Sequence, residues 1–430
     1  MSTVILDTRN RLLPVGPGAG HDLAAHHDLH GTMAVASDDG GAWRASMREA
    51  VRRSGVSGRG GGGFPSATKW EPVRAGSRSA VLVVNAMEGE PASAKDRHLL
   101  IHAPHLVLDG AEVVAEVIGA SEVVVCVSDH GPSPAASIER AIAERRSAGL
   151  SHRLTSVRQP PGRYVTGEES ALVSWLDRRQ ALPVYRTDKS RPLQLGRRPA
   201  LVHNAETLAQ VALIARHGPQ WFRRLGLPEV PGTTLVTVSG AVRCPGVVEV
   251  ELGTPVAEIL DRAGVDTPLS SVLVGGYGGA WLDGSQLSTP YAPGPLAAAG
   301  ATLGVGILVA LSASSCGIAE TARIARYLAG ESAGQCGPCV FGLPAMAHDL
   351  EQLWTGRTDQ QVLERLAVRA GQITGRGACG HPDGAARLVQ SCLRVFAADA
   401  HEHRAGHPCS GHTATTVLTL PAAPTQKEVR

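Results

Sequence analysis

The 430-residue chain lacks long hydrophobic segments and carries almost no net charge. No apolar run reaches the roughly 18 residues needed to cross a bilayer, and the N-terminus lacks a basic stretch followed by a hydrophobic one. The 41 Lys and Arg residues balance 39 Asp and Glu residues, so the formal charge is +2. This balance gives no reason to expect a nucleic-acid or anionic-membrane partner. We therefore expect a soluble, cytoplasmic protein with no direct membrane insertion.

Aromatic residues and cysteines are also scarce. Four phenylalanines beside 50 glycines and 28 prolines leave few rings that could stack against a flat ligand. Eight cysteines in a chain of this length are too few for a disulfide scaffold. Four of them lie between Cys316 and Cys379, and this clustering indicates metal or iron–sulfur ligation.

Hydrophobic periodicity divides the chain into five segments. Short apolar strands alternating with amphipathic helices predict an α/β domain with a mostly parallel sheet. A later hairpin pattern around one short helix predicts a small α+β domain, and helical spacing after it predicts a helical bundle. The predicted segments are an N-terminal extension (1–42), the α/β domain (43–230), the α+β domain (231–305), the helical domain (306–400) and a flexible tail (401–430). The extension contains His21, His26, His27 and His30, which we interpret as solvated surface.

A glycine-rich loop follows the first predicted helix of the α/β domain. Five glycines occur between Gly58 and Gly63, with Phe64 and Pro65 after them and Lys69 four residues past the proline. Without Cβ atoms, this backbone can approach a flat ligand or a phosphate and direct several N–H groups at it, while Lys69 adds a positive charge. Such loops also serve as flexible linkers, so the loop alone leaves both interpretations open.

A polar loop follows the predicted buried strand that begins at Ala80. Asn85, Glu88 and Glu90 project from this loop, at the carboxyl end of a parallel strand, where α/β sheets bind ligands. An amide and two carboxylates suit hydrogen bonds to ribose hydroxyls or to the edge of an isoalloxazine ring. The alternative is a solvated acidic loop.

Two more motif segments follow along the chain and bring the number of such segments to four. Tyr164 to Ala171 contains a Gly-Glu-Glu sequence, and His203 to Leu208 contains Asn204 and Thr207. The four segments resemble the NADH-binding FMN and iron–sulfur subunit of respiratory complex I (51 kDa subunit type) and the diaphorase subunits of NAD-linked hydrogenases and formate dehydrogenases. The resemblance implies a Rossmann-like FMN-binding domain, a ubiquitin-like domain of the ligand-binding β-grasp type and a C-terminal helical bundle carrying an iron–sulfur site.

The resemblance also implies cofactor-binding roles. Glycines line the flavin and dinucleotide cleft, a lysine lies near the FMN phosphate, and polar residues contact the flavin, the nicotinamide side or the ribityl phosphate. The implied residues are Gly58, Gly60, Gly61, Gly63, Phe64, Lys69, Asn85, Glu88, Glu90, Tyr164, Gly167, Glu168, Glu169, Asn204 and Thr207. No residue needs to act as an acid or nucleophile, because hydride chemistry belongs to the flavin; Glu88 and Glu168 are the nearest candidates.

Two departures from the family pattern affect the nicotinamide site. Met87 stands where the family usually has aspartate, while Pro72 and the stretch from Thr187 to Ser190 stand where stacking phenylalanines occur. Each lost base–ring stack removes on the order of 1–3 kcal/mol of binding energy. The departures favour one alternative, a ferredoxin-linked flavoprotein that does not bind nicotinamide.

The cysteine pattern also departs at one position. Cys336, Cys339 and Cys379 match three ligands of the family's [4Fe–4S] cluster, but Ala333 stands at the remaining position. Three thiolates alone would leave an open iron or a three-iron form. Cys316 is the predicted fourth ligand, although fifteen helical residues would place it about 22 Å away. Cys409 is its rival.

For two further cysteines we expect a structural role rather than a role as ligands. We expect Cys126 and Cys392 to be core thiols. A zinc site formed by Cys336, Cys339, Cys379 and a fourth ligand such as His381 is the competing interpretation of the cysteine pattern.

The sequence therefore predicts an oxidoreductase that passes electrons from NADH through FMN to a [4Fe–4S] cluster. From there they would reach a ferredoxin or another electron-transfer subunit. A non-catalytic, zinc-bearing scaffold subunit is the second alternative.

Overall fold

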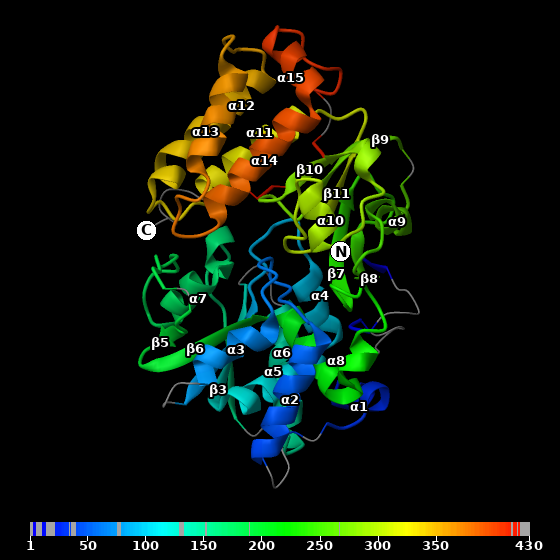
Figure 1. Ribbon diagram of the computed structural model, residues 1–430, viewed down its shortest axis with the longest axis vertical. Coiled ribbons are helices and arrows are strands. Elements are labelled where there is room, and N and C mark those ends of the chain that lie inside the picture. The colour runs from blue at the N-terminus through cyan, green and yellow to red at the C-terminus, as the bar shows by residue number, and fades with distance from the viewer. Residues whose placement is uncertain are drawn as a thin grey trace.

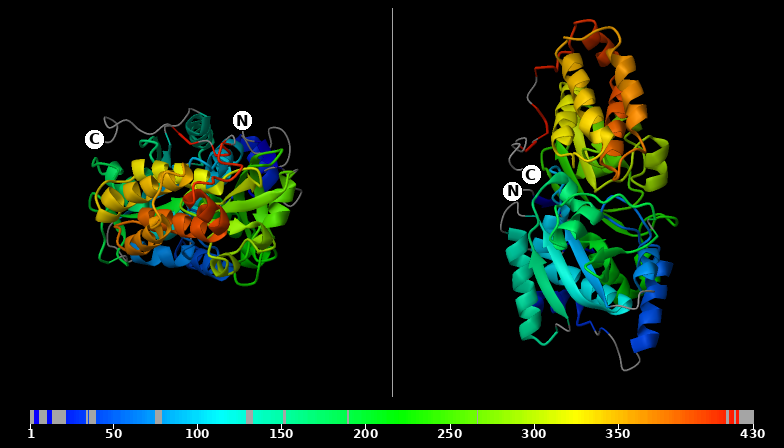
Figure 2. Two further views of the ribbon diagram at one scale, coloured as in Figure 1. Left: turned by 90° about the horizontal axis from the view of Figure 1, so that it is seen from above. Right: turned by 90° about the vertical axis from the view of Figure 1, so that its left-hand side faces the viewer.

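A computed structural model describes residues 3–5, 11–13, 22–33, 35, 40–74, 79–128, 133–150, 153–188, 190–265, 267–413, 416–418 and 420–421. His21 and residue 189 lie outside this set. The chain forms a lower α/β part, a second sheet beside and above it, and a helical bundle at the far end (Figures 1 and 2). Among the described residues, no helix is both long and apolar enough to cross a bilayer.

The first sheet has the strand order β4–β3–β2–β6–β5, and only β5 runs antiparallel to its neighbour. The Val- and Leu-rich β2 is almost wholly buried, as expected for a parallel strand covered on both faces. This confirms the predicted mostly parallel sheet. Its strands are β2 (Ala80–Ala86), β3 (Ala120–Val127), β4 (Leu154–Arg158), β5 (Leu193–Leu195) and β6 (Arg198–Asn204).

Helices cover this sheet. Two of them, α5 and α8, pack so closely that a Cβ on Gly110 would lie 1.9 Å from the carbonyl oxygen of Leu208. The helices are α2 (Gly40–Ser54), α3 (Ser66–Arg74), α4 (Lys95–His102), α5 (Pro104–Ile118), α6 (Ser133–Ser147), the 3₁₀ turn η1 (Tyr164–Gly167), α7 (Glu169–Leu176) and α8 (Ala205–Phe222).

The second sheet has six strands in the order β1–β8–β7–β11–β9–β10. Its predicted hairpin is present, because β7 and β8 pair antiparallel. Its elements are β7 (Thr233–Gly240), β8 (Gly246–Glu251), α9 (Val256–Arg262), β9 (Leu269–Val274), β10 (Ala280–Asp283), η2 (Gly284–Gln286), α10 (Pro293–Ala298) and β11 (Ile307–Ser312). Since β11 lies between β7 and β9, this sheet extends past residue 305, where we expected the domain to end.

The N-terminal segment is more integrated than the sequence indicated. Strand β1 (Thr3–Ile5) pairs parallel with β8, and α1 (Leu23–His30) packs beside α5. The ring of His26 is buried, and its Nε2 lies 2.7 Å from Oδ2 of Asp109. The prediction of a solvated histidine is therefore wrong for His26, because a buried carboxylate on α5 is its partner.

The C-terminal bundle rests on the second sheet. Trp281 of β10 is buried, packs edge-on against Phe396 and donates its ring N–H to Thr321. The helices are α11 (Gly317–Gly330), the π-helical turn η3 (Pro338–Gly342), α12 (Leu343–Trp354), α13 (Val362–Ile373), α14 (His381–Val395) and α15 (Ala397–Arg404). Helix α15 begins before residue 401 and continues past it, so the start of the predicted flexible tail is ordered. Cys126 and Cys392 are buried, as predicted.

Candidate active site

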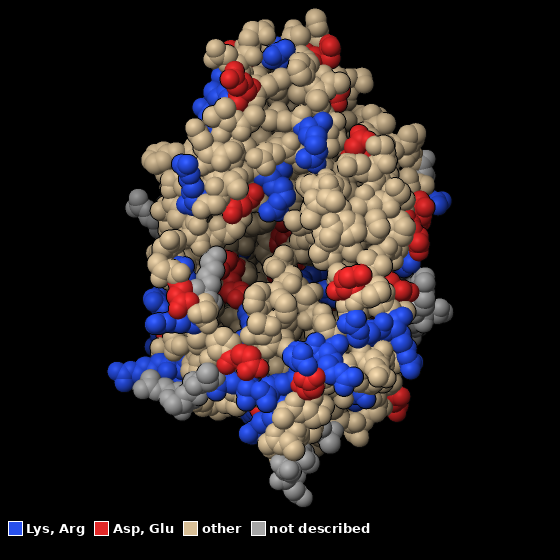
Figure 3. Space-filling model, viewed as in Figure 1, with Lys and Arg blue, Asp and Glu red and all other residues tan. Residues whose placement is uncertain are grey.

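A cleft of about 420 Å³ opens at the carboxyl ends of β2 and β6, between the α/β part, the second sheet and the bundle. Figure 3 shows a hollow in the middle of this face, with acidic residues visible inside it. The volume is in the range of cofactor pockets, about 300–1,000 Å³. Of the predicted residues, the cleft is lined by Gly60, Gly61, Asn85, Glu88, Glu90, Tyr164, Gly167, Glu168 and Asn204.

The glycine-rich loop brings bare backbone to the edge of the cleft. A Cβ on Gly60 would lie 3.3 Å from Cβ of Asn204, and one on Gly61, whose φ is +98°, would lie 3.1 Å from Val305. The loop is anchored, because the backbone N–H of Arg59 donates to Oγ1 of Thr207 at 2.9 Å. The flexible-linker interpretation is therefore wrong.

Several residues predicted in this region lie outside the cleft lining. The N–H of Gly58 closes the loop on the carbonyl of Phe64 at 2.9 Å, and Gly63 adopts a φ of +61° in the same turn. The Phe64 side chain is 54% exposed. Thr207 is buried and serves the loop through Arg59.

Two asparagines mark the ends of the central strands. Asn85 and Asn204 are register partners in the β2–β6 pair, so the sheet places them side by side. The Asn85 amide donates to the carbonyl of Gly167 at 2.9 Å, and the Asn204 amide donates to Oδ2 of Asp96 at 2.6 Å. Asn204 also caps α8, accepting from the N–H of Glu206 at 3.0 Å. These bonds hold both amides at the cleft without a ligand.

The lysine in the cleft is Lys95, which was not among the residues predicted from the sequence. Its buried Nζ lies 2.7 Å from Asp96 and 3.0 Å from Glu206. Burial alone would lower the pKa of Lys95, but the two carboxylates outweigh burial and raise that pKa. Lys69 instead bonds to Glu169 and to the carbonyl of Val202, and neither Lys69 nor Glu169 lines the cleft.

Glu90 is a buried carboxylate with one oxygen in use. Its Oε2 accepts from the N–H of Tyr277 at 3.0 Å and from the hydroxyl of Tyr164 at 3.2 Å. Among the described residues, Oε1 has no hydrogen-bond partner. Burial raises the pKa of Glu90 to about 7, so both its protonated and ionised forms are populated near neutral pH.

The other two glutamates of the cleft cap helices. Glu88, at a φ of +44°, accepts from the N–H of Asp96 at 2.9 Å and of Arg97 at 3.2 Å. Burial and the charge of Asp96 raise the pKa of Glu88. Glu168 accepts from the N–H of Ser170 at 3.0 Å and so caps α7. Both carboxylates therefore stabilise the cleft walls.

Three cysteines line a second, smaller cavity beside the cleft. Cys336, Cys339 and Cys379 face it together with Ala333. Cys379 also lines the large cleft, so the two cavities adjoin at this residue.

Family profiles match three parts of the chain. They are the Nuo51 FMN-binding domain over residues 51–213, the SLBB domain over 235–265 and the NADH-ubiquinone oxidoreductase-F iron–sulfur binding region over 319–403. The second of the NADH-quinone oxidoreductase F subunits of Rhizobium meliloti is 30% identical over 407 residues, which cover 91% of this chain and 97% of that protein. The chain belongs to the family of NADH-quinone oxidoreductase F subunits.

Other relatives agree. The NADH-quinone oxidoreductase F subunit of Streptomyces coelicolor is 31% identical over 398 residues, covering 89% of this chain and 87% of the relative. A crystal structure of an NAD⁺-reducing [NiFe]-hydrogenase matches 94% of this chain and 68% of its own, with a TM-score of 0.80 and 28% identity. The predicted resemblance and fold class are confirmed. This family member is an oxidoreductase of the NADH dehydrogenase type, and the two alternative functions are not favoured.

The cleft of this family member fits FMN. Glycine backbone, two fixed amides and a buried cation meet at strand ends, and Glu90 offers an oxygen that no described residue engages. The cleft is also lined by Gly275, Gly278, His381 and Arg387, none of which was predicted as a flavin-binding residue. No local motif marks these residues for the cleft, because they come from the turn between β9 and β10 and from α14, far in sequence from the strand ends of the first sheet.

The thiol cavity offers three of the four thiolates expected for a [4Fe–4S] cluster, and Ala333 is among the other residues that line it. Cys316 does not complete the set. It caps the start of α11, and the 14 residues of that helix put about 21 Å between it and the end of the helix nearest Ala333. Cys409 lies beside Cys316, so the structure corrects both predictions of a fourth ligand.

The zinc interpretation involving His381 also fails on geometry. Its Nε2 donates to the carbonyl of Leu328 at 2.8 Å, and its ring packs against Tyr164 with centroids 5.2 Å apart. His381 lines the large cleft and not the cavity of the three thiols.

Proposed function

We propose that the large cleft binds FMN and admits NADH, and that electrons leave through Cys336, Cys339 and Cys379 to a separate protein. The observation that supports this most directly is the position of Cys379, which lines both the cleft and the thiol cavity. A cofactor in each cavity would then meet the other at a single side chain. Bound FMN supplies hydride acceptance from NADH and release of electrons one at a time.

The chain's own residues would position the flavin mononucleotide. The backbone of Gly60 and Gly61 permits close approach, and Asn85 and Asn204 present amides whose orientation is already fixed by hydrogen bonds. Lys95 stays protonated at the cleft wall, where Asp96 and Glu206 pair with its charge, and its Nζ can also donate a hydrogen bond to a ligand oxygen. Because these groups are held before binding, little ordering free energy is lost when the ligand enters.

Glu90 is the proposed contact for NADH. Its unengaged Oε1 can accept a hydrogen bond from a ribose hydroxyl or from the carboxamide of the nicotinamide. The ionised carboxylate makes the stronger bond, so binding of NADH would favour loss of the Glu90 proton. Glu168, which also lines the cleft, is held by the N–H of Ser170 at the start of α7.

The proposed exit for electrons is the surface beside Cys336. This residue also lines an open cavity of about 530 Å³ together with Val184 and Tyr185. Tyr185 is 72% exposed and Phe341, near the same thiols in sequence, is 75% exposed. Exposed apolar side chains of this kind mark protein contacts. We infer that a ferredoxin or another electron-transfer subunit docks here, in the cytoplasm.

Anaerobic spectroscopy tests the proposed function. The chain, purified with iron and FMN present, should carry a flavin spectrum that NADH bleaches, followed by the signal of a reduced iron–sulfur centre in electron paramagnetic resonance. In Cys379→Ser, the flavin should still bleach while the iron–sulfur signal is lost. Protein that binds no FMN, or whose bound FMN stays oxidised under NADH, would contradict the proposal.

A further inference from the structure

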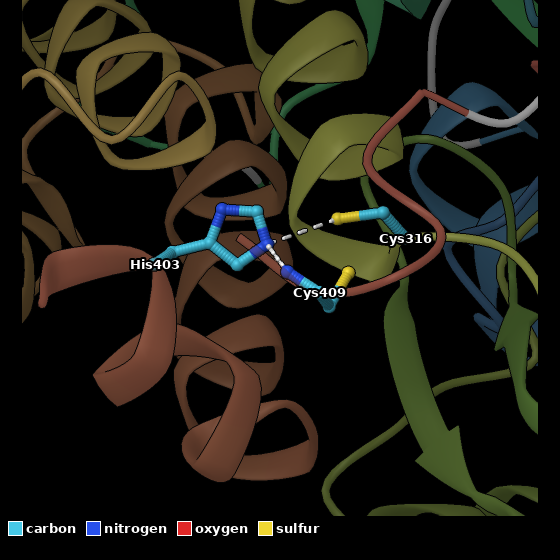
Figure 4. Close-up of side chains that lie close together, drawn as sticks. All are labelled: Cys316, His403 and Cys409. Atoms are coloured by element: carbon cyan, nitrogen blue, oxygen red, sulfur yellow. Dashed lines mark hydrogen bonds between the residues drawn. The ribbon is translucent and has the colours of Figure 1, made fainter. Parts of the chain in front are cut away.

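Three potential metal ligands meet at the end of the bundle, away from the cleft. Cys316 stands at the start of α11, His403 comes from α15 and Cys409 from the segment after it, and their side chains point toward one another (Figure 4). The two sulfur atoms and the ring nitrogen lie within 4.8 Å of one another. Cys316 and His403 are buried, and both cysteines are free thiols.

The imidazole of His403 is oriented as in a metal site. Its Nδ1 lies 3.0 Å from the carbonyl oxygen of Trp354, and a carbonyl can only accept, so Nδ1 carries the proton. The lone pair of Nε2 therefore points inward, where it accepts from the N–H of Cys409 at 3.2 Å and lies 3.6 Å from Sγ of Cys316. Around a tetrahedral zinc ion, bonded nitrogen and sulfur atoms lie about 3.6 Å apart. A backbone carbonyl behind the other ring nitrogen is the usual support for a metal-binding histidine.

The two cysteines are held in place without a metal. Sγ of Cys316 accepts from the N–H of Ala319 at 3.3 Å, which holds the side chain at the start of α11. The N–H of Cys409 donates to Nε2 of His403 at 3.2 Å, which fixes the segment after α15, and a bound metal ion would replace this hydrogen bond. Gly411 packs flush on the start of α11, because a Cβ there would come within 2.7 Å of the carbonyl of Ser314.

We propose that Cys316, His403 and Cys409 bind a zinc ion, with solvent as the fourth ligand on the half-exposed side of Cys409. Two thiolates and an imidazole are a ligand set that favours zinc over harder cations such as Mg²⁺ or Ca²⁺. Binding releases the thiol protons to solvent, while His403 keeps its Nδ1 proton. The ion joins the segment after α15 to α11, and it is distinct from the site of Cys336, Cys339 and Cys379.

Metal analysis of the full chain tests this site. Protein produced with iron and zinc in the medium and purified anaerobically should hold about one zinc per chain, with sulfur and nitrogen neighbours in zinc-edge X-ray absorption. Cys316→Ser and Cys409→Ser should each lose most of this zinc and keep FMN and iron. Cys392→Ser, which alters a buried thiol on α14, is the matched control and should keep the zinc. Cys336→Ser should lower iron and leave zinc unchanged.

Three results would overturn the proposal. They are wild-type protein without zinc, zinc retained in both serine variants, or a Cys316–Cys409 disulfide found by mass spectrometry after alkylation. Because Cys316 caps α11, its variant can misfold. His403→Gln then provides an independent loss of one ligand, and the X-ray absorption spectrum of the wild type decides the ligand set without any variant.

Discussion

The flavin cleft and the thiol cavity adjoin, yet they are built differently. The cleft forms where two parallel strands end, and the register of β2 and β6 alone places Asn85 beside Asn204. The thiol cavity forms from the turn after α11 and the loop before α14, and it is lined by Ala333 at the position where the resemblance implies a cysteine. A site at strand ends inherits its geometry from the sheet, whereas a site on loops depends on each ligand separately. The two sites should therefore respond differently to single substitutions.

The largest expected effect is the loss of iron from Cys339→Ser. With one ligand position already held by Ala333, removal of the buried thiol of Cys339 leaves two cysteines, too few to retain a cluster. Iron per chain should fall to background, while FMN content stays at the wild-type level. Iron and flavin assays on protein purified anaerobically measure both.

Cys244→Ser is the control for this change, because Cys244 is exposed in the loop between β7 and β8. It should keep both iron and FMN. Full iron content in Cys339→Ser would show that this thiol is not a cluster ligand and would weaken the contrast between the two sites.

The next effect concerns the two lysines. Lys95→Met leaves the buried Asp96 without its cation and Glu206 with Arg59 alone, so the free energy of unfolding should fall by about 3–5 kcal/mol, and FMN affinity should fall with it. Lys69→Met removes a partly exposed pair with Glu169 and should cost less than about 1 kcal/mol. Chemical denaturation and FMN titration of both variants measure the difference. Equal losses in the two variants would mean that Lys95 is not the cation on which the cleft depends.

This lysine pair also shows which features the sequence could predict. Strand ends and the hairpin of β7 and β8 were predictable because alternation and turn residues are local signals. The sequence predicted Lys69 as the lysine of the cleft, but the structure places Lys95 there. Lys69 pairs instead with Glu169, which is 100 residues away in sequence, and local patterns do not reveal such a pairing.

Long-range pairing explains the other differences. Strand β11 joins a sheet whose other strands precede it, so an apolar run at 307–312 gave no sign of which domain it would enter. Cys316 was placed at the wrong site because its partner His403 lies in a segment expected to be flexible. Helix length could have excluded Cys316 from the cluster but could not supply that partner.

A smaller effect is expected from the pH dependence of Glu90. Burial raises its pKa from the ordinary 4.5 to about 7, so the folded state holds a proton that the unfolded state has lost. Stability should therefore decrease as pH rises from about 4.5 to 7 in the wild type, and decrease less in Glu90→Gln. NADH affinity should rise through the same pH range in the wild type, because the ionised carboxylate is the better acceptor.

Thermal melts and NADH titrations at several pH values compare the wild type with Glu90→Gln. A Glu168→Gln variant, which alters another carboxylate of the cleft lining, is the control. If Glu90→Gln reproduces both wild-type profiles, Glu90 does not titrate in this range.

The smallest expected change, and the most informative about the thiol cavity, is Ala333→Cys. Ala333 faces the same cavity as Cys336, Cys339 and Cys379, so a thiol there would supply the fourth side. A cluster held by three thiolates has one iron with a non-cysteine ligand or none, and a fourth thiolate should raise iron per chain and change the electron paramagnetic resonance spectrum. Ala378→Cys, at another residue of the same cavity, is the control for an added thiol. If Ala333→Cys leaves both the iron content and the spectrum of the wild type unchanged, a fourth ligand from elsewhere already completes the cluster, and the thiol cavity is as fully built as the cleft.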